Sequence, residues 1–206
     1  MDTKTTTATK SLVGTQTEKN ILIAYLSETQ AYARYRYYAQ QAVKENYFPI
    51  QYVFLAAANN ELHHAKVYFK HLTSAAELSV PMTTNAGTIG DTVKNLQIAI
   101  AEEKEEQDTY LGFAKTAREE GFDDIASIFE AIASIEAEHG ERFEKFLKYI
   151  LTDTMWKRDE PVTWQCLVCG YRYVGKEPPV ACPACAHPTQ HYIAVEDMEG
   201  LLADAG

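Results

Sequence analysis

A pattern of glutamate, tyrosine and histidine occurs twice in this chain with identical spacing. In the first copy, Glu28 is followed by Tyr35, Glu61 and His64. The second copy keeps the same order and intervals and comprises Glu103, Tyr110, Glu136 and His139. On a helix, residues three positions apart lie on one face, so each Glu-x-x-His pair can address one point. Two such copies predict two helical hairpins whose carboxylates converge, the arrangement of a two-metal site inside a four-helix bundle.

Long stretches rich in Ala, Glu, Leu and Tyr predict four helices between residues 17 and 150. Pro49 suits a helix start, Asp91 is a good N-cap, and Gly121 suits the position after a helix end. Short connections make each helix pair antiparallel, whereas residues 74–90 form a long crossover typical of a ferritin-like bundle. We expect the helices at about 17–44, 49–72, 91–120 and 123–149.

The repeated glutamates fall within apolar helical stripes, and this position favours a metal site over a solvated surface. A glutamate among apolar residues is costly unless it is paired or bound to a cation. Oxygen-rich ligation with few nitrogens indicates iron or manganese rather than zinc. Tyr35 and Tyr110 are expected in the core, where their hydroxyls can bond to ligand carboxylates. His63 and His71 are expected to be exposed or to lie behind the ligands.

The third helix leaves two pairs of glutamates open as ligands. Glu102, Glu103, Glu105 and Glu106 crowd together, and either pair with a spacing of three could face inward. The apolar stripe of this helix and the repeat spacing both favour Glu103, with Glu106 one turn further on. Glu102 and Glu105 remain the alternative.

The four cysteines of the chain form two Cys-x-x-Cys pairs near its end. Four thiolates on two tight turns make a tetrahedral site for iron or zinc. A disulfide is a poor alternative because the chain is expected in a reducing compartment. Trp164, Tyr171 and Tyr173 predict an aromatic shell that favours iron. The cysteines are Cys166, Cys169, Cys182 and Cys185.

Net charge and hydrophobicity argue against some classes of function. The formal net charge of −10 argues against nucleic acid as a partner, because phosphate binding requires a basic face. No apolar run approaches the ~20 residues of a membrane span, and the first residues lack the apolar segment of a secretory signal, so we expect a cytoplasmic location. The expected organisation is a flexible tail (1–16), a bundle (17–150), a polar linker (151–163), a cysteine module (164–195) and an acidic tail (196–206).

With both constellations in place, the chain resembles the rubrerythrin family over about residues 17–193. The stretches that carry the resemblance include NNELHHAK, IEAEHGERF, and CLVCGY with CPACAHP. The resemblance implies a mainly α fold, a ferritin-like diiron bundle with a long crossover, followed by a small rubredoxin-like domain with one iron at the cysteines. It also implies that His64 binds iron in one redox state and gives way to Glu106 in the other. The remaining implied diiron ligands are Glu28, Glu61, Glu136, His139 and a second glutamate of the third helix, Glu103 by the preferred alignment.

The third helix departs from the family pattern. In the family, the stretch between the ligands of this helix and the following tyrosine is usually one residue longer. Alignment from the Glu-Lys-Glu-Glu side selects Glu103 and Glu106, whereas alignment from YLGFAKTA selects Glu102 and Glu105.

The resemblance implies a non-haem diiron peroxidase that reduces hydrogen peroxide to water and protects against oxidative stress. The cysteine-bound iron would return electrons, which come from NAD(P)H through a separate reductase or rubredoxin, because the chain has no GxGxxG motif. A homodimer is also implied. One rival is a ferroxidase or iron-handling ferritin-like protein, and a second is a zinc-ribbon protein whose bundle only scaffolds a partner.

Overall fold

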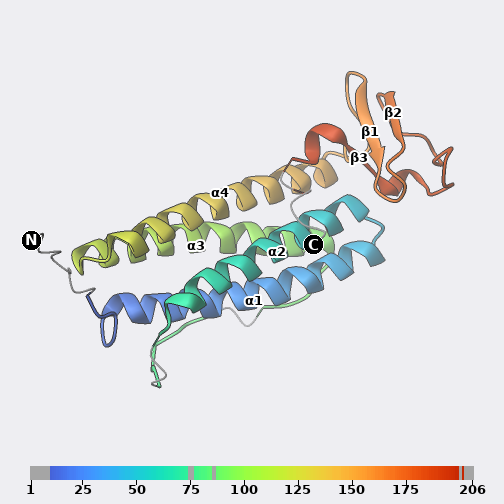
Figure 1. Ribbon diagram of the computed structural model, residues 1–206. Helices are drawn as coiled ribbons and strands as arrows, with labels where there is room; N and C mark the ends of the chain where they lie inside the picture. Colours follow the sequence, from blue (N-terminus) through green and yellow to red (C-terminus); the bar gives the residue numbers. More distant parts are fainter. Residues whose placement is uncertain (1–9, 74–76, 85–86, 200, 202–206) are drawn as a thin grey trace, which may run out of the picture.

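The computed structural model of this chain describes residues 10–73, 77–84, 87–199 and 201 (Figure 1). The predicted mainly α fold is confirmed: a four-helix bundle precedes a small strand-and-turn module. Within the described residues the helices are α1 (Gln16–Lys44), α2 (Phe48–His71), α3 (Thr92–Glu119) and α4 (Asp123–Leu151). The module contains β1 (Val162–Cys166), β2 (Arg172–Gly175) and β3 (Tyr192–Ala194), with 3₁₀ turns η1 (Thr189–His191) and η2 (Val195–Asp197). None of the described helices has the length and apolar character needed to span a membrane.

Local chemistry sets where the helices begin and end. Asp91 caps α3 as predicted, because its Oδ1 accepts a hydrogen bond from the Lys94 backbone N–H at 2.7 Å. Gly121 follows α3 with a φ of 75°, a left-handed conformation that costs glycine little. At the start of α1, Thr15 is the N-cap, since its hydroxyl oxygen accepts from the Glu18 N–H at 3.1 Å, and Glu18 Oε2 accepts in turn from the Gly14 N–H at 2.7 Å. These signals hold the two hairpins in register.

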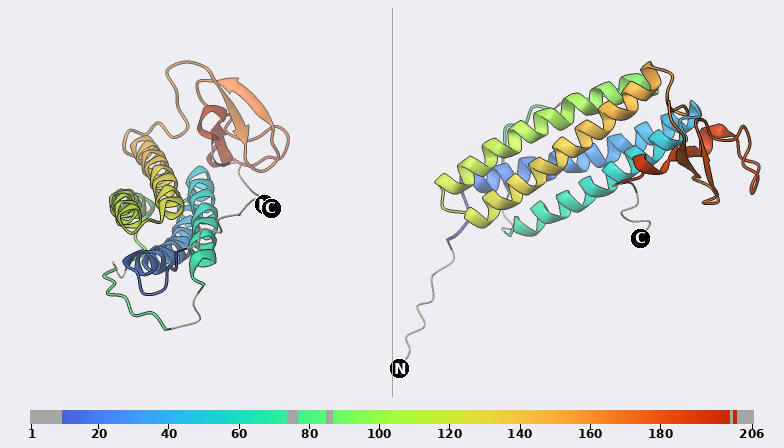
Figure 2. Two further views of the ribbon diagram at one scale, coloured as in Figure 1. Left: turned by 60° about the vertical axis from the view of Figure 1, so that its left-hand side comes forward. Right: turned by 90° about the horizontal axis from the view of Figure 1, so that it is seen from above.

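The four helices surround a common axis (Figure 2), and α1 with α2 and α3 with α4 form the two antiparallel hairpins. The crossover between α2 and α3 runs along the outside of α1 (Figure 1). Its residues 74–76 and 85–86 lie outside the described residues. The crossover therefore lets the second hairpin lie beside the first and aligns the two copies of the repeat.

Two apolar clusters fill the bundle, one on each side of its middle. The repeated glutamates and histidines lie between these clusters on all four helices, so the polar centre is closed at both ends. One cluster includes the buried rings of Tyr35, Tyr38, Phe54, Phe143 and Phe146, and the other includes those of Tyr68, Tyr110 and Phe129.

The cysteine module is a small antiparallel sheet in the order β2-β1-β3. Trp164 is fully buried in it and donates a hydrogen bond from Nε1 to the Gly175 carbonyl at 2.9 Å. The predicted aromatic shell is only partly right. Tyr171 and Tyr173 are 37% and 40% exposed, and Tyr192 from β3, on the other side of β1, takes the buried position instead.

The module packs against the end of the bundle where α2 begins and α4 ends (Figure 2). The Phe48 ring stacks on His191 with centroids 3.7 Å apart, and Ile193 and Met198 join the neighbouring bundle cluster. Of the segments expected as tails, residues 1–9, 200 and 202–206 lie outside the described residues. The described part of the acidic segment packs against the bundle, and its Asp197 is buried.

Candidate metal centres

The bundle helices bring the glutamates and histidines of the repeat together at one buried place. Glu61 and Glu136 take part in two groups of ligand atoms, and within each group these atoms lie no more than 4.8 Å apart. The first group is Glu28, Glu61, His64 and Glu136, and the second is Glu61, Glu103, Glu136 and His139. The two groups are related by the sequence repeat.

Glu61 and Glu136 stand between the two histidines. His64 Nδ1 lies 3.0 Å from Glu61 Oε2 and 3.0 Å from Glu136 Oε1. His139 Nδ1 lies 3.1 Å from Glu61 Oε1 and 2.9 Å from Glu136 Oε2. Each of these carboxylates thus offers one oxygen to each histidine. That is the geometry of a bridging carboxylate between two metal positions.

The two repeated tyrosines cross between the hairpins. Tyr35 of α1 donates a hydrogen bond to Glu103 Oε1 of α3 at 2.6 Å, and Tyr110 of α3 donates to Glu28 Oε1 of α1 at 2.8 Å. Both hydroxyls are buried. The second carboxylate oxygen of each glutamate, Oε2, has no hydrogen bond among the described residues. Each tyrosine therefore fixes one carboxylate while an oxygen stays available inside the site.

The glutamates of the third helix have four different environments. Glu103 is buried in the ligand group, whereas Glu102 forms an ion pair with Arg34 of α1. Glu105 is exposed. Glu106 is half-buried and lies outside both four-residue groups.

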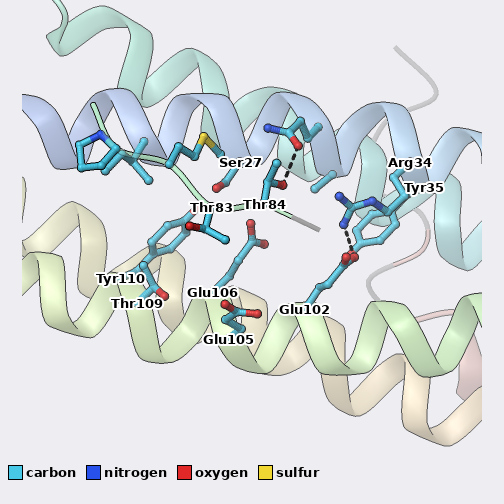
Figure 3. Close-up of a pocket in the computed structure, with 15 residues that line it drawn as sticks. Ser27, Arg34, Tyr35, Thr83, Thr84, Glu102, Glu105, Glu106, Thr109 and Tyr110 are labelled. Carbon is cyan, nitrogen blue, oxygen red and sulfur yellow. Dashed lines mark hydrogen bonds and ion pairs between the residues drawn. The ribbon is translucent and has the colours of Figure 1, made fainter. Parts of the chain in front are cut away.

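A cavity of about 170 Å³ lies between α1, α3 and the crossover, and Glu106 lines it (Figure 3). Tyr35 and Tyr110 contribute to its wall, so it borders the ligand groups. Crossover residues 81–84 cover it from outside. The space accommodates several water-sized molecules.

Burial and mutual repulsion make it energetically unfavourable for all carboxylates of the site to be ionised at once without a metal. Burial raises the pKa of Glu103 to about 8, against the opposing contact with His139. The pKa of Glu61 falls to about 2, because the nearby His139 and His64 outweigh its burial. Burial disfavours a charged His64, yet its close contacts with the carboxylates of Glu136, Glu28 and Glu61 raise its pKa to about 12. In the protein alone, protons thus balance the negative charge.

This donor set fits two divalent cations. The four buried carboxylates carry four negative charges when ionised, and two divalent ions would balance them. Several oxygens of Glu28, Glu103 and Glu136 have no hydrogen bond among the described residues, although they are buried. Buried polar atoms are rarely left without partners, and a metal is the partner that this geometry provides for.

The four cysteines form the second candidate centre. All four sulfur atoms lie within 4.8 Å of one another, with Cys166 and Cys185 3.7 Å apart and Cys169 and Cys182 3.6 Å apart. A tetrahedral site with metal–sulfur bonds of about 2.3 Å places its sulfur atoms about 3.8 Å apart. The sulfur atoms therefore have the spacing of a single-metal cage.

Comparison with known proteins identifies the family to which the chain belongs. Residues 19–87 and 94–163 match the rubrerythrin family, and residues 164–193 match the rubredoxin-like domain of rubrerythrins. The chain belongs to the rubrerythrin family. It is 43% identical over 190 residues to the rubrerythrin of Porphyromonas gingivalis, which covers 92% of this chain and 94% of that protein. It is 41% identical over 184 residues to the rubrerythrin of Nitratidesulfovibrio vulgaris, covering 89% and 96% of the two chains.

Solved structures support the same fold. The fully reduced, all-ferrous state of nigerythrin is similar with a TM-score of 0.60 and 27% identity, covering 92% of this chain and 91% of that one. A bacterioferritin of Mycobacterium tuberculosis matches with a TM-score of 0.56 and 18% identity, covering 66% of this chain and 86% of that one, which shows the ferritin-like fold alone. As a rubrerythrin, the chain has two cofactors, a non-haem diiron centre and a single iron bound by four cysteines, which is the chemistry of a diiron oxidoreductase.

Sequence reasoning missed Asn60 and Arg34. Asn60 Oδ1 lies 3.2 Å from His139 Nε2, and Arg34 pairs with Glu102 beside the cavity. Neither residue belongs to the doubled pattern, and each contacts a residue far away in the chain. His63 is exposed and His71 is half-buried, and neither belongs to the ligand groups.

Proposed function

We propose that this rubrerythrin is a peroxidase that reduces hydrogen peroxide to water at its diiron centre. The observation that supports this most strongly is the bridging arrangement of Glu61 and Glu136 between two histidines, beside a cavity of about 170 Å³. A small neutral oxidant fits that cavity.

The proposed ligands follow from the two groups. Glu61 and Glu136 would bridge the metals, and His139 would bind one of them throughout. His64 and Glu106 would alternate at the other, as the family resemblance implies. His64 lies in a ligand group and Glu106 lines the cavity beside it, which supports these two residues as the alternating ligands. Glu28 and Glu103 would complete the set as terminal ligands.

Reduction of one hydrogen peroxide to two waters consumes two electrons and two protons, and iron held by these residues would supply the electrons. The chain itself holds the carboxylates in place through Tyr35 and Tyr110. The apolar clusters on both sides exclude bulk water from the centre. Thus the residues present an oriented pocket to a small oxidant.

The electron supply is proposed to run through the iron at Cys166, Cys169, Cys182 and Cys185. A separate NAD(P)H-dependent reductase or a rubredoxin would reduce this iron. We further propose a homodimer in which the cysteine module of one subunit approaches the diiron centre of the other, in a reducing, cytoplasmic setting. All four cysteines are unpaired thiols, as such a setting requires.

An iron-handling role is the alternative, since the carboxylate centre alone would also suit a ferroxidase. The cysteine module weighs against it, because an enzyme that draws its electrons from ferrous iron has no need of a second redox centre. The two functions differ in what they consume. Oxygen uptake stimulated by added ferrous iron, in excess of peroxide turnover with a reductant, would favour the ferroxidase.

The test is peroxide consumption by chemically reduced protein under anaerobic conditions. The unaltered protein is expected to consume peroxide in proportion to its bound iron. Glu61→Ala and Glu136→Ala should each remove most of this consumption, because each deletes a bridge. Peroxide consumption that persists in both variants would refute the site, and protein that holds one zinc and no iron per chain would refute the redox function.

A further inference from the structure

The two halves of the ligand site differ at the residue before each bridging glutamate. In the first copy of the repeat this residue is Asn60, and in the second it is Ile135. Asn60 Oδ1 lies 3.2 Å from His139 Nε2. Ile135 has no side-chain hydrogen-bonding group, and within residues 10–73, 77–84, 87–199 and 201 no hydrogen bond to His64 Nε2 is found. His139 therefore has a hydrogen-bonding partner at its second ring nitrogen, whereas His64 has none there among the described residues.

The contact with Asn60 determines which nitrogen of His139 faces the site. A neutral imidazole carries a proton on one nitrogen and a lone pair on the other. If Nε2–H donates to Asn60, the lone pair remains on Nδ1, which lies 3.1 Å from Glu61 and 2.9 Å from Glu136. Histidine ligands usually have such a partner on the second nitrogen, and its loss typically weakens metal binding by ~10–100-fold.

The two histidines also differ in burial, and His139 is again the more restrained of the two. The His139 side chain is 1% exposed, whereas the His64 side chain is 9% exposed. A ring that is enclosed and hydrogen-bonded at its far nitrogen has little freedom to rotate. The His64 ring has neither restraint to the same degree.

We propose that Asn60 is a positioning residue that keeps His139 as the permanent histidine ligand, and that its absence from the other half lets His64 leave. The inference rests on the proposed metal site. Asn60 and Ile135 are one difference between the two copies of the repeat, and Glu106, which corresponds to Ala31 in the first copy, is another. Together, the Asn60 contact at His139 and the position of Glu106 would confine the proposed ligand exchange to one metal position.

The experiment titrates the full-length apoprotein with Co²⁺, which is stable in air and reports its ligands by visible absorption. Cobalt at the cysteines is distinguished by its thiolate absorption. The unaltered protein is expected to bind two ions in the bundle. Asn60→Leu should weaken one of them by ~10–100-fold and leave the other unchanged, and Asn60→Asp, which keeps an acceptor, should restore tight binding. Equal binding of both ions by Asn60→Leu and the unaltered protein would overturn the proposal.

Ile135→Asn is the reciprocal variant, because it places an acceptor at the matching position of the second half. It should tighten the other cobalt ion. Should Asn60→Leu fail to fold, proton exchange in the cobalt-loaded unaltered protein decides the question. The Nε2–H of His139 should exchange with D₂O more slowly than that of His64, and equal exchange rates would overturn the proposal. If the unaltered bundle binds no cobalt, the proposed metal site itself is wrong, and the role of Asn60 is rejected with it.

Discussion

Replacing Asp197 with asparagine is expected to loosen the attachment of the cysteine module to the bundle. The Asp197 carboxylate is 3% exposed, and it pairs with Arg158 at 2.6 Å and with Lys145 at 2.5 Å. Tyr149 donates a further hydrogen bond to it at 3.1 Å. This single side chain therefore ties the segment after β3 to both α4 and the linker.

The magnitude follows from what each partner loses. Removing one member of a buried ion pair costs roughly 3–5 kcal/mol. Lys145 is 44% exposed and can turn to water, and Arg158 keeps hydrogen bonds to the Thr154 and Lys157 carbonyls. The expected loss for Asp197→Asn is therefore below that range, about 2–3 kcal/mol.

Urea unfolding and limited proteolysis of the linker measure this loss. Glu196→Gln is the matched control: Glu196 also pairs with Arg158, but it is 54% exposed, and an exposed pair contributes at most about 1 kcal/mol. Asp197→Asn should open the linker to protease at lower urea concentrations than the control does. Equal stability of the two variants, within about 0.5 kcal/mol, would refute the role assigned to the buried pair.

Three further predictions concern the site, one helix start and the module. Tyr35→Phe and Tyr110→Phe should each destabilise the cobalt-loaded protein by ~1.5–3 kcal/mol in urea unfolding, because each removes a hydrogen bond to a buried carboxylate. A loss of stability below ~0.5 kcal/mol would count against the role of these hydrogen bonds. The pKa of Glu120 is lowered by its hydrogen bonds to the start of α1, chiefly from Thr17, so its contribution is full above the unfolded pKa of ~4.3 and is lost as the pH falls through the folded pKa. Because Glu120 is partly exposed, Glu120→Gln should be less stable by no more than ~1 kcal/mol at pH 7, and this difference should disappear as the pH falls through the folded pKa of Glu120, whereas a difference that is constant with pH would contradict the linkage. Removal of the cysteine-bound metal, or Cys182→Ser, should abolish the near-ultraviolet circular dichroism of the module, because a module this small depends on its metal for folding; an unchanged spectrum would contradict this.

The bundle could be predicted because its signals are local. The apolar stripes, Asp91 and Gly121 each act through neighbours within a few residues, so the chain sequence alone indicates where the helices start and stop. The internal repeat then supplied the long-range information. It selected the same helical phase for Glu28 and Glu103.

The remaining features depend on contacts that no local pattern encodes. Asn60 is one turn before His64 on α2, yet it bonds to His139 on α4. Asp197 belongs to a segment whose composition suggests a solvated tail, and its burial becomes favourable through the approach of Arg158 and Lys145, which lie far from it in the chain. The exposure of Tyr173 and the burial of Tyr192 likewise depend on how the strands of the module pack, which sequence alternation cannot reveal.

The most direct test of the proposed function is an anaerobic visible spectrum of the reduced protein before and after addition of peroxide. Reduction should bleach the absorption of the cysteine-bound iron, and peroxide should restore it as electrons pass to the bundle centre. In Glu61→Ala the colour should stay bleached on the same timescale, because the bridging carboxylate is missing. If the colour fails to return in the unaltered protein, or returns equally fast in Glu61→Ala, the two centres do not act in one pathway.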